Sequence, residues 1–279
     1  MPETPRVVGD RQRGSEFVTG TSVPILMYHE VSPDPHPSFR RYTVTVREFT
    51  RQMRWLAALG YEAIDMDALV RARMGQSSLP KRPVLITFDD GFQGCVHHAV
   101  PVLQAHKFTA VFYLVTGLMG ETSRWMLPEL GPELPLMSWE TARALAANGF
   151  QCGAHTVTHP RLAGLDPARC RAELMDARRR LEVELGRPTV HLAYPFGSYD
   201  RGVQAIAAEA GYVTGCSTRA GLSGPDDVLL ALRRVTIYGH DSLLDFVCRL
   251  RTGTAVRERL GQALGDVARR FRRRRGSRP

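Results

Sequence analysis

The sequence predicts an α/β fold, a single domain built as a distorted or incomplete (β/α)7-type barrel. The chain has 279 residues, 43% of them hydrophobic, which suits one large core. Short segments rich in β-branched residues alternate with amphipathic segments, the pattern of a parallel sheet covered by helices. Chemically active side chains follow several of the expected strands, which is where barrel enzymes carry their sites.

The alternation starts at residue 23. Strands are expected at residues 23–28, 61–64, 85–88, 109–115, 212–217 and 234–238, with another before His155. Helices are expected at residues 45–59, 66–73, 95–107, 138–149, 166–185, 200–210 and 242–250. Their ends carry local signals, such as the capping box that begins at Thr45 and the glycine stop at Gly186. Residues 30–42, with three prolines, should form an irregular loop over the barrel mouth.

The apolar run 85–88 ends at two adjacent aspartates, Asp89 and Asp90, followed by Gly91. Neighbouring carboxylates repel each other, so a fold keeps two of them at a strand end mainly where a cation or a proton compensates their charge. The pair therefore indicates a metal site, although an ordinary Asp-Gly turn has the same residues.

Two histidines, His155 and His159, follow another short apolar run. Imidazoles four residues apart can converge on one ion if the segment coils into a helical turn, and one carboxylate would complete three protein ligands. Histidines also fill surfaces and cores, so this spacing alone does not decide. A third segment, 193–200, contains Phe196 and has the form of a strand-to-helix turn capped by Asp200.

These three segments, in this order, resemble those of the polysaccharide deacetylase family, the carbohydrate esterases with a NodB homology domain. The resemblance runs from about Val23 to about Leu250 and includes the elements Thr-Phe-Asp-Asp-Gly and His-Thr-x-x-His. The opening strand, which ends in Tyr28-His29, is similar to the branch of the family that acts on poly-N-acetylglucosamine.

The resemblance implies a role for each residue. Asp89 would be the general base, Asp90, His155 and His159 the metal ligands, and Phe196 the donor of a backbone N–H to the oxyanion. The chemistry agrees, because amide hydrolysis needs a polarised carbonyl and an activated water, which a divalent ion can supply, and a base beside the ion. Zinc is expected rather than a hard, all-oxygen ion, with cobalt or nickel as alternatives.

Two features depart from the best-known family pattern. The histidine that protonates the leaving amine has no plain counterpart: His240 is displaced from the expected element, and His29 is the other candidate for the acid. Ala193 stands where many relatives have an arginine that orients the base. Either Arg233 or Arg234 can replace it; the alternative is that both lie at a solvated strand end.

Cysteine usage and hydropathy bear on location. The five cysteines are scattered and form no Cys-x-x-Cys, which suits free thiols in a reducing compartment. No apolar run approaches the ~20 residues that span a bilayer, and residues 1–20 contain no signal-peptide apolar region. A cytoplasmic protein is therefore expected.

We expect three parts along the chain: a disordered segment at 1–22, the deacetylase barrel at 23–252, and a basic amphipathic helix or tail at 253–279. Seven arginines between residues 269 and 278 supply most of the net charge of +9. A basic amphipathic helix can bind an anionic membrane surface, so peripheral association with the inner face is expected, with a solvated tail as the alternative. No base-reading motif accompanies the tail, so no nucleic acid partner is expected.

The expected function is metal-dependent removal of N-acetyl groups from the sugars of a polysaccharide, oligosaccharide or lipid-linked glycan. Trp125, on the long loop 117–137, either lines the substrate groove or packs under its own loop. Two other functions stay open. An O-acetyl esterase would use the same site on a better leaving group, without a strong acid. An inactive protein would keep the metal and only bind carbohydrate.

Overall fold

The structure is a computed structural model that describes residues 22–127 and 131–256. The segment expected to be disordered, 1–22, lies outside these ranges except for Ser22. Most of the expected basic tail, from residue 257 onward, lies outside them too.

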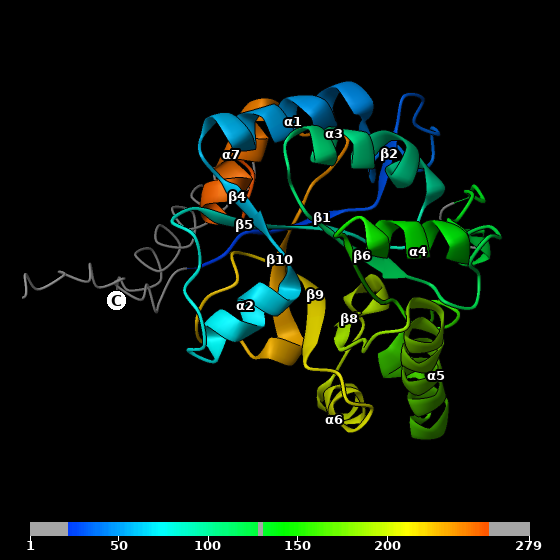
Figure 1. The fold of residues 1–279 in the computed structure, drawn as a ribbon. Coiled ribbons are helices and arrows are strands. Elements are labelled where there is room, and N and C mark those ends of the chain that lie inside the picture. The colour runs from blue at the N-terminus through cyan, green and yellow to red at the C-terminus, as the bar shows by residue number, and fades with distance from the viewer. Residues whose placement is uncertain (1–21, 128–130, 257–279) are drawn as a thin grey trace, which may run out of the picture.

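The described chain forms a closed parallel barrel, which confirms the predicted (β/α)7-type fold (Figure 1). Its strands are β1 Ile25–Tyr28, β5 Pro83–Phe88, β6 Val111–Leu114, β7 Gln151–Ala154, β8 His191–Ala193, β9 Thr214–Ala220 and β10 Leu232–Thr236. They follow the order β1-β10-β9-β8-β7-β6-β5, and pairing of β1 with β5 closes the ring. A further strand, β4 (Glu62–Ile64), pairs with the first half of β5.

Helices surround the barrel (Figure 1). They are α1 Val46–Ala58, α2 Met66–Arg73, α3 Val100–Ala105, α4 Trp139–Ala147, α5 Pro167–Leu185, α6 Arg201–Glu209 and α7 Leu243–Thr252. Local sequence explains their ends: the Thr45 side chain caps α1, Asp166 caps α5, and Ser242 and Asp245 form a reciprocal capping box on α7. Among the described residues no helix is long and apolar enough to span a bilayer.

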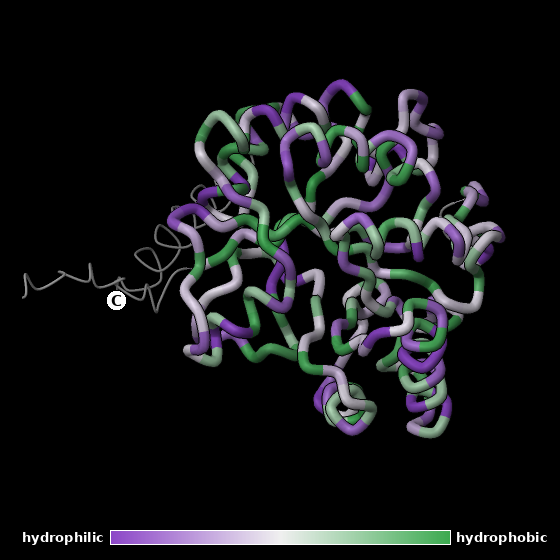
Figure 2. Tube along the Cα trace, viewed as in Figure 1, coloured by the Kyte–Doolittle hydropathy of each residue, from purple (hydrophilic) through white to green (hydrophobic). Residues whose placement is uncertain are grey.

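The core has two layers, because successive residues of each strand face opposite sides. Ile25, Leu85 and Tyr113 belong to the cluster inside the barrel. Their neighbours Leu26 and Phe112 belong to the cluster between the barrel and the helices. Figure 2 shows the hydrophobic residues following the central strands, with hydrophilic residues on the outer turns of the helices. The strands are buried on both faces, as parallel strands usually are.

Two segments form other kinds of element than those expected. The loop expected at 30–42 begins with a short strand, β2 (Glu30–Ser32), which pairs in parallel with β3 (Thr43–Thr45). Val31 and Val44 anchor this pair because both are buried in the outer core. The helix expected at 95–107 divides into a π-helix, η1 (Cys95–Ala99), followed by α3.

Candidate active site

The predicted site residues gather at the carboxyl ends of the barrel strands. Tyr28 pairs with Phe88 at the ends of β1 and β5, so His29 and Asp89 leave the sheet side by side. The Asp89 N–H donates to the Tyr28 carbonyl at 3.0 Å, which continues the ladder by one residue. His155 follows the last residue of β7 in the same way. All parallel strands end on one face of the barrel, and that face carries the site.

Asp90, His155 and His159 form the one cluster of three potential metal ligands among the described residues. Their ligand atoms all lie within 4.8 Å of one another. Asp90 Oδ1 is 3.3 Å from His155 Nε2 and 3.2 Å from His159 Nε2. All three side chains are buried. The structure thus brings together the three residues expected to hold a metal.

The two histidines converge through a loop and not through the helical turn that their spacing suggested. Thr156 and His159 both adopt left-handed backbone conformations, with φ of 66° and 62°. The Thr156 hydroxyl accepts the His159 N–H at 3.0 Å and closes the turn. Asp90 is also left-handed, with φ of 73°. Such conformations are costly for residues other than glycine and persist where surrounding contacts impose them.

A buried glutamate that the sequence analysis did not identify holds this loop in place. Glu173 of α5 accepts the Val157 and Thr158 N–H groups at 2.8 and 2.9 Å, and the Thr158 hydroxyl at 2.5 Å. Its one sequence signal is its register, because it lies three residues after Cys170 and four before Ala177 on the buried face of the helix. A carboxylate in an apolar stripe needs partners, and here those partners belong to the histidine loop.

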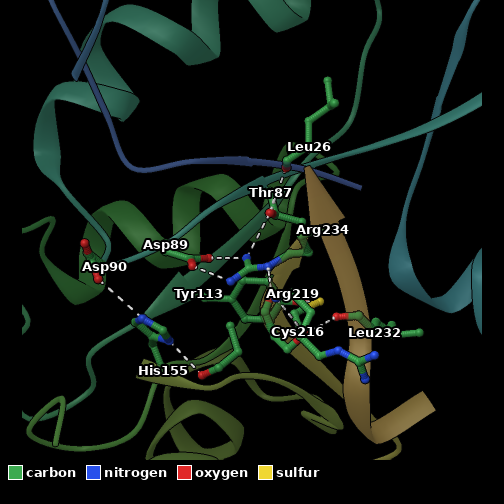
Figure 3. A network of polar contacts seen from close by, with 12 residues as sticks. Leu26, Thr87, Asp89, Asp90, Tyr113, His155, Cys216, Arg219, Leu232 and Arg234 are labelled. Carbon is green, nitrogen blue, oxygen red and sulfur yellow. Dashed lines mark hydrogen bonds and ion pairs between the residues drawn. The ribbon is translucent and has the colours of Figure 1, made fainter. Parts of the chain in front are cut away.

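The donor set fits a divalent cation. The His155 ring bonds the Ala193 carbonyl through Nδ1 at 2.7 Å, so Nδ1 carries the proton and Nε2 presents a lone pair to Asp90 in the neutral tautomer (Figure 3). A lone pair opposite a carboxylate oxygen requires a proton or a metal between them. Two ligands about 2.05 Å from a tetrahedral zinc ion are separated by about 3.4 Å. The separations of 3.2 and 3.3 Å agree with that geometry.

The protonation tendencies of these residues follow the same logic. Burial raises the pKa of Asp90, but the hydrogen bonds from His155 and His159 outweigh burial and hold that pKa well below its usual range. Burial lowers the pKa of His155, and its bond to Asp90 reverses the direction, so that the pKa is raised. At His159 burial outweighs the bond to Asp90, and the pKa is lowered. The shifts of Asp90 and His155 are those of a site that favours positive charge beside the Asp90 carboxylate.

Asp89 is held by a bidentate ion pair with Arg234 (Figure 3). Both bonds measure 2.6 Å, from Nη1 to Oδ1 and from Nη2 to Oδ2. Arg234 is completely buried and donates further to the Thr87 hydroxyl and the Ser217 carbonyl. Burial raises the pKa of Asp89, but the Arg234 charge and bonds outweigh it and leave the pKa lowered. Asp89 is therefore an anion at neutral pH.

Sequence reasoning left Arg233 and Arg234 as alternatives for this position and also allowed that both were solvated. The structure separates them, since neighbouring strand residues face opposite sides. Arg233 turns outward and pairs with Asp227 at 2.8 Å. Arg234 turns into the barrel and meets Asp89, so the solvated interpretation is wrong for Arg234.

A cavity of about 400 Å³ opens above this group. Its polar residues include Asp89, Asp90, His29, His155 and His159. Its walls are largely aromatic, with Phe39, Tyr42, Trp125, Phe196 and Tyr238. Trp125 stacks on the His159 ring, with 4.5 Å between the ring centroids, so it lines the cavity and covers a candidate ligand at once.

The two candidate acids lie in different environments. His29 lines the cavity, and its Nδ1 is buried with no hydrogen-bond partner among the described residues. Burial lowers the pKa of His29 against the opposing effect of Asp90 and Asp89, so the ring is neutral at pH 7. His240 is exposed, stacks on Tyr238 and is not among the cavity residues. The structure therefore brings His29, and not His240, to the site.

Phe196 occupies the third expected position through its backbone. It is left-handed, with φ of 57°, inside the short 3₁₀ turn η4 (Pro195–Gly197). The turn is closed by the next two amides, since Gly197 donates to Tyr194 and Ser198 donates to Pro195. Neither bond uses the Phe196 N–H. The Phe196 ring lies against His159 at 4.6 Å, with Arg161 above it at 4.0 Å.

Comparisons with known proteins agree with this geometry. The family model described as polysaccharide deacetylase matches residues 76–215, half of the chain. YxkH of Bacillus subtilis, which carries a polysaccharide deacetylase name, is 27% identical over 215 residues, covering 77% of this chain and 71% of that protein. The poly-beta-1,6-N-acetyl-D-glucosamine N-deacetylase of Escherichia coli K12 is 28% identical over 136 residues, but they span only 20% of that enzyme.

Solved structures share the fold over most of the chain. The deacetylase PplD of Streptococcus pyogenes, in complex with acetate, superposes with a TM-score of 0.73 and 26% identity, covering 83% of this chain and 99% of PplD. IcaB of Ammonifex degensii superposes with a TM-score of 0.66 and 26% identity, covering 77% of this chain and 91% of IcaB. The chain belongs to the polysaccharide deacetylase family and is a carbohydrate deacetylase by descent.

Proposed function

We propose that the protein hydrolyses the N-acetyl groups of N-acetylated sugars, using a divalent metal ion, zinc, and Asp89 as the general base. The observation that carries the proposal is that one cavity holds both the Asp90, His155 and His159 cluster and a carboxylate that Arg234 fixes beside it. The names of relatives such as the Escherichia coli N-deacetylase support the N-acetylated substrate.

The roles follow from the chemistry of the amide. A divalent ion held by the three ligands would polarise the acetyl carbonyl and favour ionisation of water. Asp89 takes a proton from the water while the water oxygen attacks the carbonyl carbon. The Phe196 N–H supports the charge that develops on the carbonyl oxygen. The carbon–nitrogen bond then breaks, the nitrogen gains a proton, and acetate and a free amino sugar leave.

His29 is the group we assign to protonation of the nitrogen, because it lines the cavity and His240 does not. Since its lowered pKa leaves the ring neutral at pH 7, His29 must first receive the proton that the attacking water releases to Asp89, and then pass it to the nitrogen. This requirement favours a second function, O-deacetylation. An ester releases an alcohol that needs less help from an acid, so a site with a neutral imidazole suits esters as well.

The test is acetate release by the zinc-supplemented protein from N-acetylated oligosaccharides and from O-acetylated sugars side by side. Asp89→Asn, which keeps the size of the side chain, is the control. Release from the amides that disappears in Asp89→Asn is the expected result. Release from esters alone would change the reaction class to an esterase. No release from either substrate, in a protein with bound zinc, would reject the hydrolase and leave a carbohydrate-binding protein.

A further inference from the structure

A second cavity lies on the other side of the segment that walls the active site. Phe39 and Tyr42 line the first cavity, whereas His36 and Thr43 of the same segment line the second. The second cavity has a volume of about 250 Å³. Two carboxylates, Glu30 and Asp34, contribute to its lining. The proposed mechanism uses neither of them.

Glu30 is the notable residue of this cavity. It directly follows His29, but successive strand residues face opposite sides, so it lines the second cavity and not the first. The side chain is only 6% exposed, and its Oε1 has no hydrogen-bond partner among the described residues. The Glu30 carboxylate packs against the main chain of Gly94, and a Cβ atom at residue 94 would overlap it. A buried polar atom without a partner is costly unless something else binds it.

The charge of the cavity favours a cation. Burial and the nearby Asp90 raise the pKa of Glu30, a backbone hydrogen bond at Val31 lowers it, and together they bring it to about 8, so that without a ligand the carboxyl is mostly protonated at pH 7. A positive group in the cavity would offset both effects, since an opposite charge within contact distance favours the ionised carboxylate. Asp34 is a second carboxylate, exposed at the mouth, and two histidines, His36 and His97, also line the cavity.

The remaining lining residues indicate an organic cation and not a bare metal ion. Among the described residues, only the Asp90 cluster places three ligand atoms close enough to hold a metal, so Glu30 belongs to no preformed chelate. The Thr43 hydroxyl and the Gln93 amide can bond hydroxyl groups. Leu134 and Pro135 give the cavity an apolar wall. An ammonium group on a ring that carries hydroxyls matches these features.

We propose that this second cavity binds the ammonium group of a deacetylated amino sugar through Glu30, as an accessory subsite beside the active site. The choice of ligand rests on the proposed function, because the amino sugar is the product of N-deacetylation. A subsite of this kind would hold a glycan by a unit that already lacks its acetyl group while a neighbouring unit is processed.

The test is isothermal titration calorimetry of the zinc-supplemented, full-length protein with D-glucosamine and, separately, N-acetyl-D-glucosamine at pH 7. Glucosamine should bind at least tenfold more tightly than its neutral, acetylated form. Glu30→Gln keeps the shape of the side chain and should weaken glucosamine binding at least tenfold. Asp34→Asn, at the exposed mouth, should weaken it a few fold. Glu140→Gln, an exposed glutamate at the start of α4, is the matched control and should change nothing.

Three results would overturn the proposal. Equal affinity for the two sugars would show that the ammonium is not recognised. Glucosamine binding that survives Glu30→Gln but is lost in His155→Ala would be product binding at the metal cluster. A second equivalent of zinc that Glu30→Gln removes would make the cavity a metal site. Acetate release is measured separately from these titrations. Glucosamine binding through Glu30 without any acetate release would reject the deacetylase function alone. Acetate release without glucosamine binding through Glu30 would reject the subsite alone.

Discussion

Replacing Arg234 by methionine should be among the most damaging single changes to the barrel. The guanidinium and the Asp89 carboxylate are both buried and share two bonds of 2.6 Å. Removing one member of such a pair leaves an uncompensated charge in the interior, which costs about 3–5 kcal/mol in the free energy of unfolding. If Asp89 is the general base as proposed, loss of its fixed geometry should also lower kcat about 10²- to 10⁴-fold.

The pH dependence of this loss can be derived from the pKa of Asp89. In the wild type that pKa is lowered, so the ion pair contributes fully above the unfolded value of about 3.9 and is lost as the pH falls through the native pKa. In Arg234→Met burial, the largest influence, is opposed only by the weaker effects of His155 and His29, so the pKa of Asp89 rises. The variant can then gain a proton at mildly acidic pH. The difference in unfolding free energy between wild type and variant should therefore be largest at pH 7 and smaller at pH 5.

Urea denaturation at both pH values and acetate release measure these effects. The matched control is Arg233→Met, because Arg233 is the adjacent arginine but its side chain is 43% exposed in its pair with Asp227. Such a pair contributes about 0–1 kcal/mol, so the control should stay close to wild type. The double variant Arg234→Met with Asp89→Asn removes both charges and should regain part of the lost stability. Equal losses in the two arginine variants, or a double variant with simply additive losses, would refute the reasoning.

Three further changes test the rest of the structure. Removing metal with a chelator should abolish acetate release and lower Tm, and added zinc should restore both. The reason for the change in Tm is that a ligand that binds only the native state stabilises it. An unchanged Tm and an unchanged rate would refute a metal at the Asp90 cluster. Glu173→Gln should weaken zinc binding about 10- to 100-fold, measured by competition with a coloured chelator, because the loop that carries His159 loses its anchor; unchanged affinity would show that the loop holds itself. His191→Phe removes hydrogen bonds of 2.9 Å to Asp67 and to Thr214 at the other end of the barrel. The free energy of unfolding should fall by about 1–3 kcal/mol, while kcat stays unchanged. A loss of kcat would contradict a purely structural role for His191.

The sequence predicted the ends of helices well where capping residues mark them. The start of α5 at Pro167 follows from Asp166 and a proline at the first helical position, and its end follows from Gly186 with φ of 64°. The bounds of α2 also agree with the expectation, and the Asp65 side chain caps its start. Strand β9 runs to Ala220, beyond the predicted end at residue 217, because its pairing with β10 decides the length. Pairing between distant segments leaves no local signal.

The same distinction separates the parts of the site. Asp89, Asp90 and His155 stand within two residues of strand ends, so parallel topology alone brings them to one face. The choice between Arg233 and Arg234 could not be made from sequence, because a shift of one residue in the register of β10 would exchange the side chain that enters the barrel. Contacts across long separations, such as Arg234 with Asp89, are set by that register.

The two histidines of the candidate metal cluster are held by different means, and the difference has a consequence. His155 is fixed by a hydrogen bond from Nδ1 to the Ala193 carbonyl, whereas the Nδ1 of His159 has no partner among the described residues. His159 is instead enclosed by rings, with Trp125 stacked at 4.5 Å and Phe196 edge-on at 4.6 Å. Packing between rings restrains the position of an imidazole, but it fixes the direction in which the ring nitrogens point less well than a hydrogen bond does. The orientation of His159 therefore depends on the aromatic wall of the cavity, so a substrate that displaces Trp125 would also move a proposed metal ligand.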